Sequence, residues 1–223
     1  MTQVLRFADA ASLQDLGKYV RRGRRVNEQG IRLQAQGRVV AAWLPVMTPG
    51  SLNSRIPAVL GLRTMALAEH TEADVTVELA SISERLARLN PASMDLPLPP
   101  AGINAPWTAV TPPRSGWEPR GRLADSTLRR TAEGGIEEIA AAVPDTAGAH
   151  VVEQVREGVW GRALEPSAGD DVIAGTPIPA GAAFGALSLG FLTPGDGVSD
   201  VYALGKWLRI SSAGGFILCR AVS

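Results

Sequence analysis

The sequence predicts an α+β protein, with an N-terminal antiparallel sheet flanked by helices and C-terminal helices followed by a small antiparallel sheet. Apolar residues recur at helical spacing in residues 7–25 and alternate with polar residues in several stretches of residues 31–79. Beyond residue 123, three helical segments precede three short strands, which is a winged-helix-like order. We predict three parts along the chain. An N-terminal α+β subdomain spans residues 1–90, and a Pro/Trp-rich connector spans residues 91–122. A C-terminal helical subdomain with a small sheet spans residues 123–223.

The first helix is predicted over residues 7–25. Leu13, Leu16 and Val20 fall on one face of this helix, and Asp9 or Ser12 can cap its first turn. Its last turns are strongly basic, with cations at Lys18, Arg21, Arg22, Arg24 and Arg25. Cations at a helix C-terminus interact favourably with the helix dipole and with solvent, so such a run also occurs without a function. The alternative is a surface patch for phosphate, anionic lipid or an acidic partner.

Four strands and a second helix are predicted next. The strand-like stretches are residues 31–35, 39–44, 58–68 and 75–79. Gly37 supplies a turn between the first two stretches. Ser81 and Glu84 have the spacing of a capping box, which predicts that the second helix begins there.

The clearest change in composition lies between residues 91 and 119. This stretch holds eight of the sixteen prolines, together with Trp107 and Trp117. Proline fixes φ and removes a hydrogen-bond donor, so the stretch cannot form a regular helix or a central strand. Two tryptophans in a mobile linker would expose a large apolar surface. We therefore expect both rings to pack on a domain.

Three helices are expected in the C-terminal half. Asp125 can cap the first, and the adjacent Gly134 and Gly135 mark either a break in it or a close contact with another helix. The third helix, residues 181–192, is apolar nearly all round, which predicts that it is buried.

Three strands end the predicted fold, at residues 198–204, 207–211 and 216–220. Gly205 and Lys206, between the first two, fit a two-residue hairpin turn with glycine first.

The chain has 223 residues and a formal net charge of zero, but the charge is unevenly distributed. Residues 1–64 carry ten basic and three acidic residues, whereas residues 65–223 carry twelve and nineteen. The neutral total and the ordinary hydrophobic content exclude a histone-like protein, a disordered acidic tail and a disulfide scaffold. A single cysteine and the absence of a signal-peptide pattern predict a cytoplasmic location. The longest nearly apolar run, residues 181–192, is too short to span a membrane.

Side chains that perform catalysis or bind metals are few and scattered. The two histidines, His70 and His150, have no cysteine near them in the sequence, and Cys219 lies in an apolar strand as a structural residue. Ser188 lies in a relaxed nucleophile-elbow pattern, but the residues before it are helical and no histidine follows it. The acidic pair that begins at Asp170 lacks the spacing of a calcium loop, and we expect solvated loop acids there. We therefore predict no catalytic, cofactor-binding or metal-binding residue and no cofactor.

The winged-helix-like order makes DNA binding a rival interpretation. The third helix would enter the major groove, but residues 181–192 contain no basic or amide side chain. Base readout requires Arg, Lys, Asn or Gln on that helix. Sequence-specific binding to nucleic acid is therefore not expected. A winged-helix-like arrangement of these elements would instead bind another protein.

Four segments carry a family resemblance, namely residues 39–45 (VVAAWLP), 74–77 (DVTV), 112–117 (PPRSGW) and 205–210 (GKWLRI). In these segments the chain resembles a family of uncharacterised actinobacterial proteins of similar length. The resemblance covers most of the chain, and its motifs are structural rather than catalytic. It implies a bacterial cytoplasmic protein and no particular substrate.

Three functional hypotheses follow. The first is a non-enzymatic protein-interaction or scaffold protein with an unknown protein partner. The second is a small-molecule-binding protein or an unfamiliar enzyme with a pocket between the halves, and the third is a transcriptional regulator with a degenerate winged helix. Homo-oligomerisation is left open. The candidate interaction residues are Lys18, Arg21, Arg22, Arg24, Arg25, Trp107 and Trp117.

Overall fold

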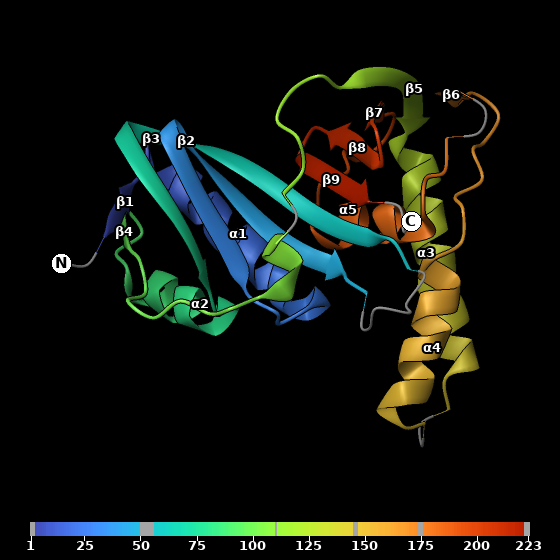
Figure 1. The fold of residues 1–223 in the computed structure, drawn as a ribbon, viewed down its shortest axis with the longest axis horizontal. Helices are drawn as coiled ribbons and strands as arrows, with labels where there is room; N and C mark the ends of the chain where they lie inside the picture. Colours follow the sequence, from blue (N-terminus) through green and yellow to red (C-terminus); the bar gives the residue numbers. More distant parts are fainter. Residues whose placement is uncertain (1–2, 50–55, 110, 145–146, 174–175, 221–223) are drawn as a thin grey trace. The chain divides into compact units, whose positions relative to one another are not determined.

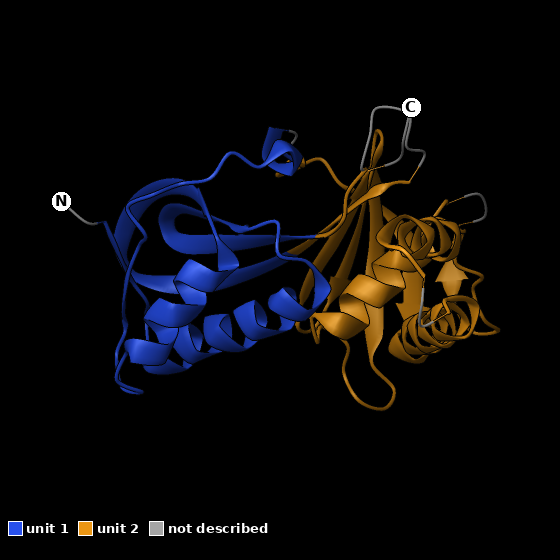
Figure 2. Cartoon of the chain, turned by 90° about the horizontal axis from the view of Figure 1, so that it is seen from below, with its two compact units in different colours: residues 1–45, 62–111 blue, residues 46–61, 112–223 orange. Residues whose placement is uncertain are grey.

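The chain forms two compact units (Figure 2), made of residues 1–45 with 62–111 and of residues 46–61 with 112–223. The computed structural model describes residues 3–49, 56–109, 111–144, 147–173 and 176–220. The two longest strands, β2 (Ile31–Met47) and β3 (Ala58–Val77), each contribute residues to both units. Among the described residues, no helix is both long enough and apolar enough to cross a membrane.

A small two-stranded sheet brings the start of the chain to the segment after the second helix in unit 1. β1 (Val4–Arg6) pairs antiparallel with β4 (Asp95–Pro97), and an isolated bridge joins Phe7 to Leu67 of β3. Phe7 is fully buried and Leu67 nearly so, so this bridge lies in the core of the unit.

α1 (Ala10–Val26) follows the predicted amphipathic pattern. The carboxylate of Asp9 accepts a hydrogen bond from the backbone N–H of Ser12 at 2.7 Å, which caps the first turn and lowers the pKa of Asp9. At Gly23 the helix approaches β2 so closely that a side chain would collide with Leu44. The buried face consists of Leu13, Leu16, Tyr19, Val20 and Gly23.

The four strands predicted in the first half are two long strands. β2 continues through the predicted turn at Gly37, where the backbone φ is 65°. Glycine adopts a positive φ without strain, so it can accommodate an irregularity inside a strand, as at a bulge. β3 likewise joins the predicted stretch 58–68 to the first part of the predicted stretch 75–79, and it ends at Val77 because Leu79 already belongs to the next helix. Local turn signals are overridden here because the two strands are hydrogen-bonded neighbours in one sheet.

α2 (Leu79–Arg88) begins earlier than predicted. Glu78 precedes the helix without a side-chain capping bond, and Ser81 lies within the first turn. The predicted capping box at Ser81 and Glu84 is therefore wrong. Leu79 and Ile82 are buried, so burial of the apolar face sets the start of this helix.

Unit 2 has the predicted α+β composition but not the predicted winged-helix-like order (Figure 1). Its elements are β5 (Glu118–Ala124), α3 (Asp125–Ala142), α4 (Ala149–Trp160), β6 (Asp171–Val172), α5 (Ala180–Ser188), β7 (Val198–Leu204), β8 (Trp207–Ser212) and β9 (Gly215–Arg220). β5 precedes the helices and pairs antiparallel with both β7 and β6, in a seven-stranded sheet of order β2-β3-β9-β8-β7-β5-β6. β5 resembles a connector in sequence because of Pro119, which the register shift between Pro119 and Gly121 accommodates.

The two faces of the β7–β8–β9 sheet differ in their burial. Val201, Ile210 and Ile217 share one face and are almost completely buried. Gly185 of α5 packs close to Ile217, so α5 covers this face. Alternate residues point to the opposite face, which we call the open face. It carries the half-buried Tyr202 and Arg209, but Leu218 and Trp207 on the same face are buried.

α3 is continuous through its glycine pair. A side chain at Gly135 would collide with the Trp160 ring of α4, whereas Gly134 has open space around it. Of the two alternatives for this glycine pair, the close contact is confirmed, and the helix is not broken. α5, rich in alanine and glycine, is buried as predicted.

Candidate functional site

The basic residues singled out in the sequence lie on the exposed side of α1. At 100° per residue, four of them fall within an arc of about 100° opposite the buried face. We call this set the basic stripe, and its exposed residues are Lys18, Arg21, Arg22 and Arg25. Arg24 lies to one side of the stripe, and its Nη2 forms an ion pair with Oε1 of Glu28 at 3.7 Å.

Most of the stripe is not neutralised by acids. Among the described residues, no carboxylate lies within ion-pair distance of Lys18, Arg21 or Arg25. Clustered cations without acidic neighbours raise the local positive potential, which attracts polyanions and acidic surfaces.

The two connector tryptophans lie in different units. Trp107 belongs to the short 3-10 helix η1 (Pro106–Ala109) in unit 1, and its indole N–H donates to the carbonyl of Gln29 at 3.0 Å. Trp117 precedes β5 in unit 2, and its indole N–H donates to the carbonyl of Pro113 at 3.1 Å. Both rings are half-buried, as expected for side chains that pack on a domain.

Trp117 is one of three aromatic residues that surround Arg209. The guanidinium carbon of Arg209 lies 4.4 Å from the centre of the Tyr202 ring and 4.9 Å from that of Trp117. The Phe216 ring centre is 6.0 Å away. All three distances fall within the range of cation–π attraction. We call Trp117, Tyr202, Arg209 and Phe216 the arginine cluster.

The hairpin registers position three members of the arginine cluster. Gly205, in the predicted two-residue turn, has a φ of 57°, and the resulting register sets Tyr202 directly opposite Arg209. In the next hairpin Arg209 pairs with Leu218 and lies diagonally across from Phe216. Backbone hydrogen bonds therefore hold these side chains on the open face of the sheet.

Arg209 retains hydrogen-bonding capacity. Among the described residues, its Nε is buried without an acceptor, and the buried hydroxyl of Ser211 on the same face also lacks a partner. The Arg209 side chain as a whole is half-buried, and no carboxylate of the described residues lies within ion-pair distance of it. A planar guanidinium matches the two oxygens of a carboxylate.

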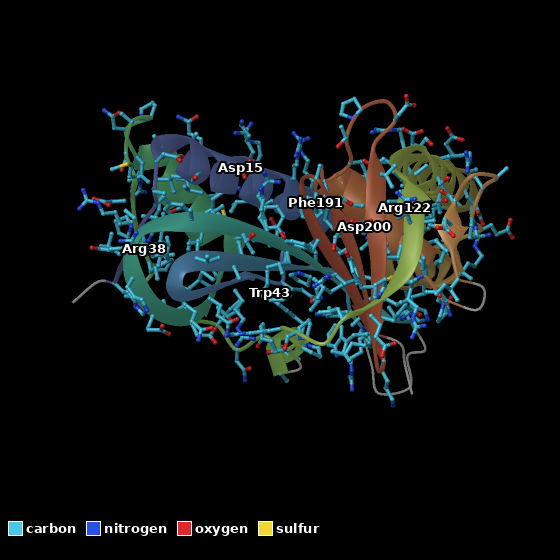
Figure 3. All side chains as sticks on the ribbon, turned by 90° about the horizontal axis from the view of Figure 1, so that it is seen from above. Asp15, Arg38, Trp43, Arg122, Phe191 and Asp200 are labelled. Atoms are coloured by element: carbon cyan, nitrogen blue, oxygen red, sulfur yellow. The ribbon has the colours of Figure 1, made fainter. Side chains whose placement is uncertain are left out.

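The open face carries a positive balance around the arginine cluster. Arg122 of β5 is directly opposite Asp200 of β7, and Figure 3 shows these two residues on adjacent strands. Arg220 of β9 is opposite Trp207, on the same face. Asp171 of β6 is opposite Arg122 on its other side. Three arginines, Arg122, Arg209 and Arg220, thus share this face with two acids, Asp171 and Asp200, which leaves a small positive balance that favours an anionic partner.

The buried acid at the start of α3 serves the fold. Asp125 is 1% exposed, and its carboxylate accepts hydrogen bonds from the backbone N–H of Thr193 at 2.7 Å and the Ser199 hydroxyl at 2.6 Å. The hydroxyls of Ser199 and Ser212 lie 2.7 Å apart. This network fixes α3 to the loop before β7 and to the sheet.

Asp170 is not the solvated loop acid that the sequence predicts. Its carboxylate accepts hydrogen bonds from the backbone N–H groups of Ala124 at 2.7 Å and Ser167 at 2.6 Å. It also accepts one from the Thr127 hydroxyl at 2.9 Å. Asp170 therefore satisfies donors at the start of α3 from a distant loop, which no local spacing indicates.

The residues considered for catalysis do not converge. His70 lies on β3 in unit 1, His150 lies on α4 in unit 2, and both are exposed. Ser188 is the last residue of α5, so it does not follow a strand. Cys219 is buried in β9, where burial raises the pKa of its thiol, as for a structural cysteine. The described part of the chain holds no group of three His, Cys, Asp or Glu side chains suited to a metal ion.

Sequence reasoning found one member of the arginine cluster, Trp117, and missed the other three. The predicted turn at Gly205 already implies that Tyr202 faces Arg209, so a signal for this pair was present. The contact of Trp117 with Arg209 depends on the path of the connector, which local patterns do not determine.

Solved structures with a similar fold are sliding clamps of DNA polymerase. The sliding clamp from Caulobacter crescentus matches with a TM-score of 0.57 and 13% identity, over 99% of this chain and 66% of that chain. The DNA polymerase III subunit beta from Pseudomonas aeruginosa has a TM-score of 0.54 and 11% identity, over 100% and 65%. The griselimycin-bound sliding clamp from Bartonella birtlesii has a TM-score of 0.59 and 11% identity, over 99% and 65%.

This likeness concerns the fold alone, because the identities are low. The chain spans 65 or 66% of the length of these clamps. Their fold overturns the winged-helix-like order predicted for residues 123–223, while the α+β class is confirmed.

Family comparisons agree with a resemblance to proteins without an assigned activity. No curated protein matches the chain. Residues 1–108 match DUF8010, described as a domain of unknown function. Residues 112–223, half of the chain, match DUF8185, also described as a domain of unknown function, and the protein therefore belongs to the DUF8185 family.

Proposed function

We propose that the protein is a non-enzymatic scaffold with the sliding-clamp fold, and that an acidic peptide segment of a partner protein docks on the arginine cluster. The observation that carries this proposal is the half-buried Arg209, surrounded by three aromatic rings and without a carboxylate partner within the described chain. The solved structures with this fold are named as sliding clamps and as a subunit of DNA polymerase III, which supports a scaffold role.

An acidic peptide fits both parts of the arginine cluster. Its carboxylate can pair with the accessible part of the half-buried Arg209 side chain, and its neighbouring apolar side chains can pack on the half-buried rings. The rings keep water away from part of the guanidinium, which strengthens its ion pair with a carboxylate. Trp, Tyr and Arg are also the residues most enriched where binding energy concentrates in protein interfaces.

Peptide selection tests this proposal. Short random peptides displayed on phage are selected on the full-length protein, and the enriched peptides are measured by fluorescence anisotropy. We expect them to carry Asp or Glu beside an apolar residue. Arg209→Gln should weaken their binding about tenfold or more, because it removes a charge-assisted hydrogen bond. Trp117→Ala should also weaken binding, because it removes one ring from the guanidinium.

The matched control is Arg122→Gln, which makes the same charge change on the open face outside the arginine cluster. We expect it to leave peptide binding within about twofold, the effect of a screened surface charge. Enrichment of peptides without acidic residues, or an equal loss in Arg209→Gln and Arg122→Gln, would contradict the proposal.

The basic stripe favours a second candidate function, contact with the phosphate backbone of nucleic acid without reading its sequence. Backbone binding needs clustered cations but no base-reading helix. A winged-helix regulator is not proposed, because α5, which would be its reading helix, is buried. Sliding clamps of DNA polymerase share the fold, which also supports this second candidate.

Mobility shifts with random-sequence duplex DNA, between about 50 and 200 mM salt, test the second candidate. Replacing the four cations of the basic stripe by glutamine should weaken binding and flatten its salt dependence. Arg88→Gln on α2 removes an exposed cation outside the stripe and should have little effect. Absence of binding at the lower salt concentration would exclude this candidate.

Several expectations from the sequence stay predictions. The interaction role of Trp107 and Arg24, homo-oligomerisation, a cytoplasmic location and an actinobacterial source are among them. A pocket between the halves, and with it a small-molecule-binding or enzymatic role, is also a prediction. So are the domain boundaries at residues 1–90, 91–122 and 123–223, which limited proteolysis of the full chain can test.

A further inference from the structure

A groove of about 430 Å³ lies between α1 and α2 within unit 1, where Figure 2 shows the two helices side by side. Its apolar lining includes Leu13 of α1 together with Leu86 and Leu89 at the end of α2. Leu13 is buried, whereas Leu86 and Leu89 are half-buried, so part of this apolar surface is available to a ligand. The volume is in the range of small-molecule sites.

The charged side chains that line the groove are all cations. Lys18 and Arg21 of the basic stripe line it, and none of its described lining residues carries a carboxylate. Neither cation has an acidic partner among the described residues. The remaining polar lining comes from amides and hydroxyls, including Gln14 and Ser83. The groove therefore favours an anionic group.

Leu13 and the two cations line different turns of α1, with polar Asn90 beside Leu89 and apolar Val20 beside Arg21. The Gln14 side-chain amide donates to the carbonyl of Pro91 at 3.0 Å, so the early turns of α1 adjoin the chain just after α2. Leu13 and Leu89 belong to these segments. Lys18 and Arg21 are one and two turns further along α1.

We propose that this groove binds a small amphiphilic carboxylate, a carboxylate headgroup on an unbranched alkyl chain. The headgroup pairs with Lys18 and Arg21, and the alkyl chain lies over Leu13, Leu86 and Leu89. Charge complementarity selects the anionic head, and contact with the chain removes the exposed apolar surface of Leu86 and Leu89 from water. This site is separate from the arginine cluster, which belongs to unit 2.

Isothermal titration of the full chain with decanoate, below the concentration at which it forms micelles, tests the proposal. We expect saturable binding that strengthens from octanoate to decanoate, by up to about fourfold for each added methylene. Decylamine, with the same chain and the opposite charge, should not compete. The double variant Lys18→Gln/Arg21→Gln should bind decanoate about tenfold more weakly or worse.

The matched control is Arg22→Gln/Arg25→Gln, which removes the same charge from the same helix at residues that do not line the groove. We expect decanoate binding by this variant to stay within about twofold of the original protein. All variants are first compared in thermal unfolding, and the substitutions are on exposed side chains. No saturable binding, equal losses in the two double variants, or equal binding of decylamine would each overturn the proposal.

Discussion

Gly121 occupies a backbone position that a larger residue cannot take. Its φ is 111°, and a Cβ there would collide with the backbone of Asp171 on the neighbouring strand β6. Gly169 has a similar φ of 103° with open space around it. The two glycines therefore separate the cost of the backbone conformation from the cost of the close approach.

We predict that Gly169→Ala lowers the free energy of unfolding by about 1–2 kcal/mol, the cost of a positive φ for an L-residue. Gly121→Ala should lower it by a further 1–3 kcal/mol or so, because β5 and β6 must also separate. Urea unfolding monitored by tryptophan fluorescence measures both. Equal effects of the two substitutions would show that the strands do not approach as described.

Asp9 gives the first helix a pH-dependent contribution to stability. The Ser12 N–H lowers the pKa of Asp9 below its ordinary value of 3.8, so the folded state favours the ionised form. The contribution is therefore complete above pH 3.8 and is lost as the pH falls through the lowered pKa. Asp9→Ala should lower the melting temperature at pH 7 and have a smaller effect at about pH 2. If the difference in melting temperature between Asp9→Ala and the original protein is the same at pH 7 and at about pH 2, Asp9 does not cap the helix as described.

Arg209 shows why single residues of the site escape sequence reasoning. An arginine in an amphipathic strand is ordinarily a solvated residue, and its importance here comes from rings on other segments. Tyr202 could be placed by the hairpin turn at Gly205, whose register is a local property. Trp117 reaches Arg209 through long-range packing, and Asp170 reaches α3 in the same way. Contacts between segments that are distant in the sequence cannot be predicted from the spacing of residues.

At the scale of elements, the contact between α3 and α4 rests on one of two adjacent glycines. Gly135→Ala should lower the free energy of unfolding by about 1–3 kcal/mol, because the Cβ displaces the Trp160 ring. Gly134→Ala should raise it by about 0.5–1 kcal/mol, because alanine favours the helix and meets nothing within 4 Å. Chemical denaturation measures the free energy of unfolding of both variants. If both substitutions raise this free energy, or both lower it, the described packing is contradicted.

Elements with local signals could be predicted, and elements that depend on distant partners could not. α1 has its cap at Asp9 and its apolar period in adjacent turns, and the β7–β8 hairpin has a glycine turn. β5 exists because it pairs with β7, which lies far along the chain. β2 and β3 likewise stay extended through turn-like residues because they are neighbours in one sheet.

At the scale of the whole molecule, the charge asymmetry of the sequence appears on particular elements. The basic excess of residues 1–64 includes the basic stripe on α1. In unit 2, α3 exposes Glu133, Glu137 and Glu138. The positive balance on the open face is thus a local feature of an otherwise acidic unit. That contrast favours a specific docking site over general attraction to anions.

Photo-crosslinking in living cells tests the docking claim most directly. A photo-reactive benzoylphenylalanine replaces Leu204, a half-buried residue on β7 beside the segment that carries Trp117. The same replacement at Glu133 of α3 serves as the comparison. We predict a covalent adduct with an acidic segment of another protein from position 204, not from position 133, and its loss when Arg209→Gln is added. Absence of an adduct at position 204, or its survival with Arg209→Gln, would contradict the proposal that the arginine cluster is a docking site.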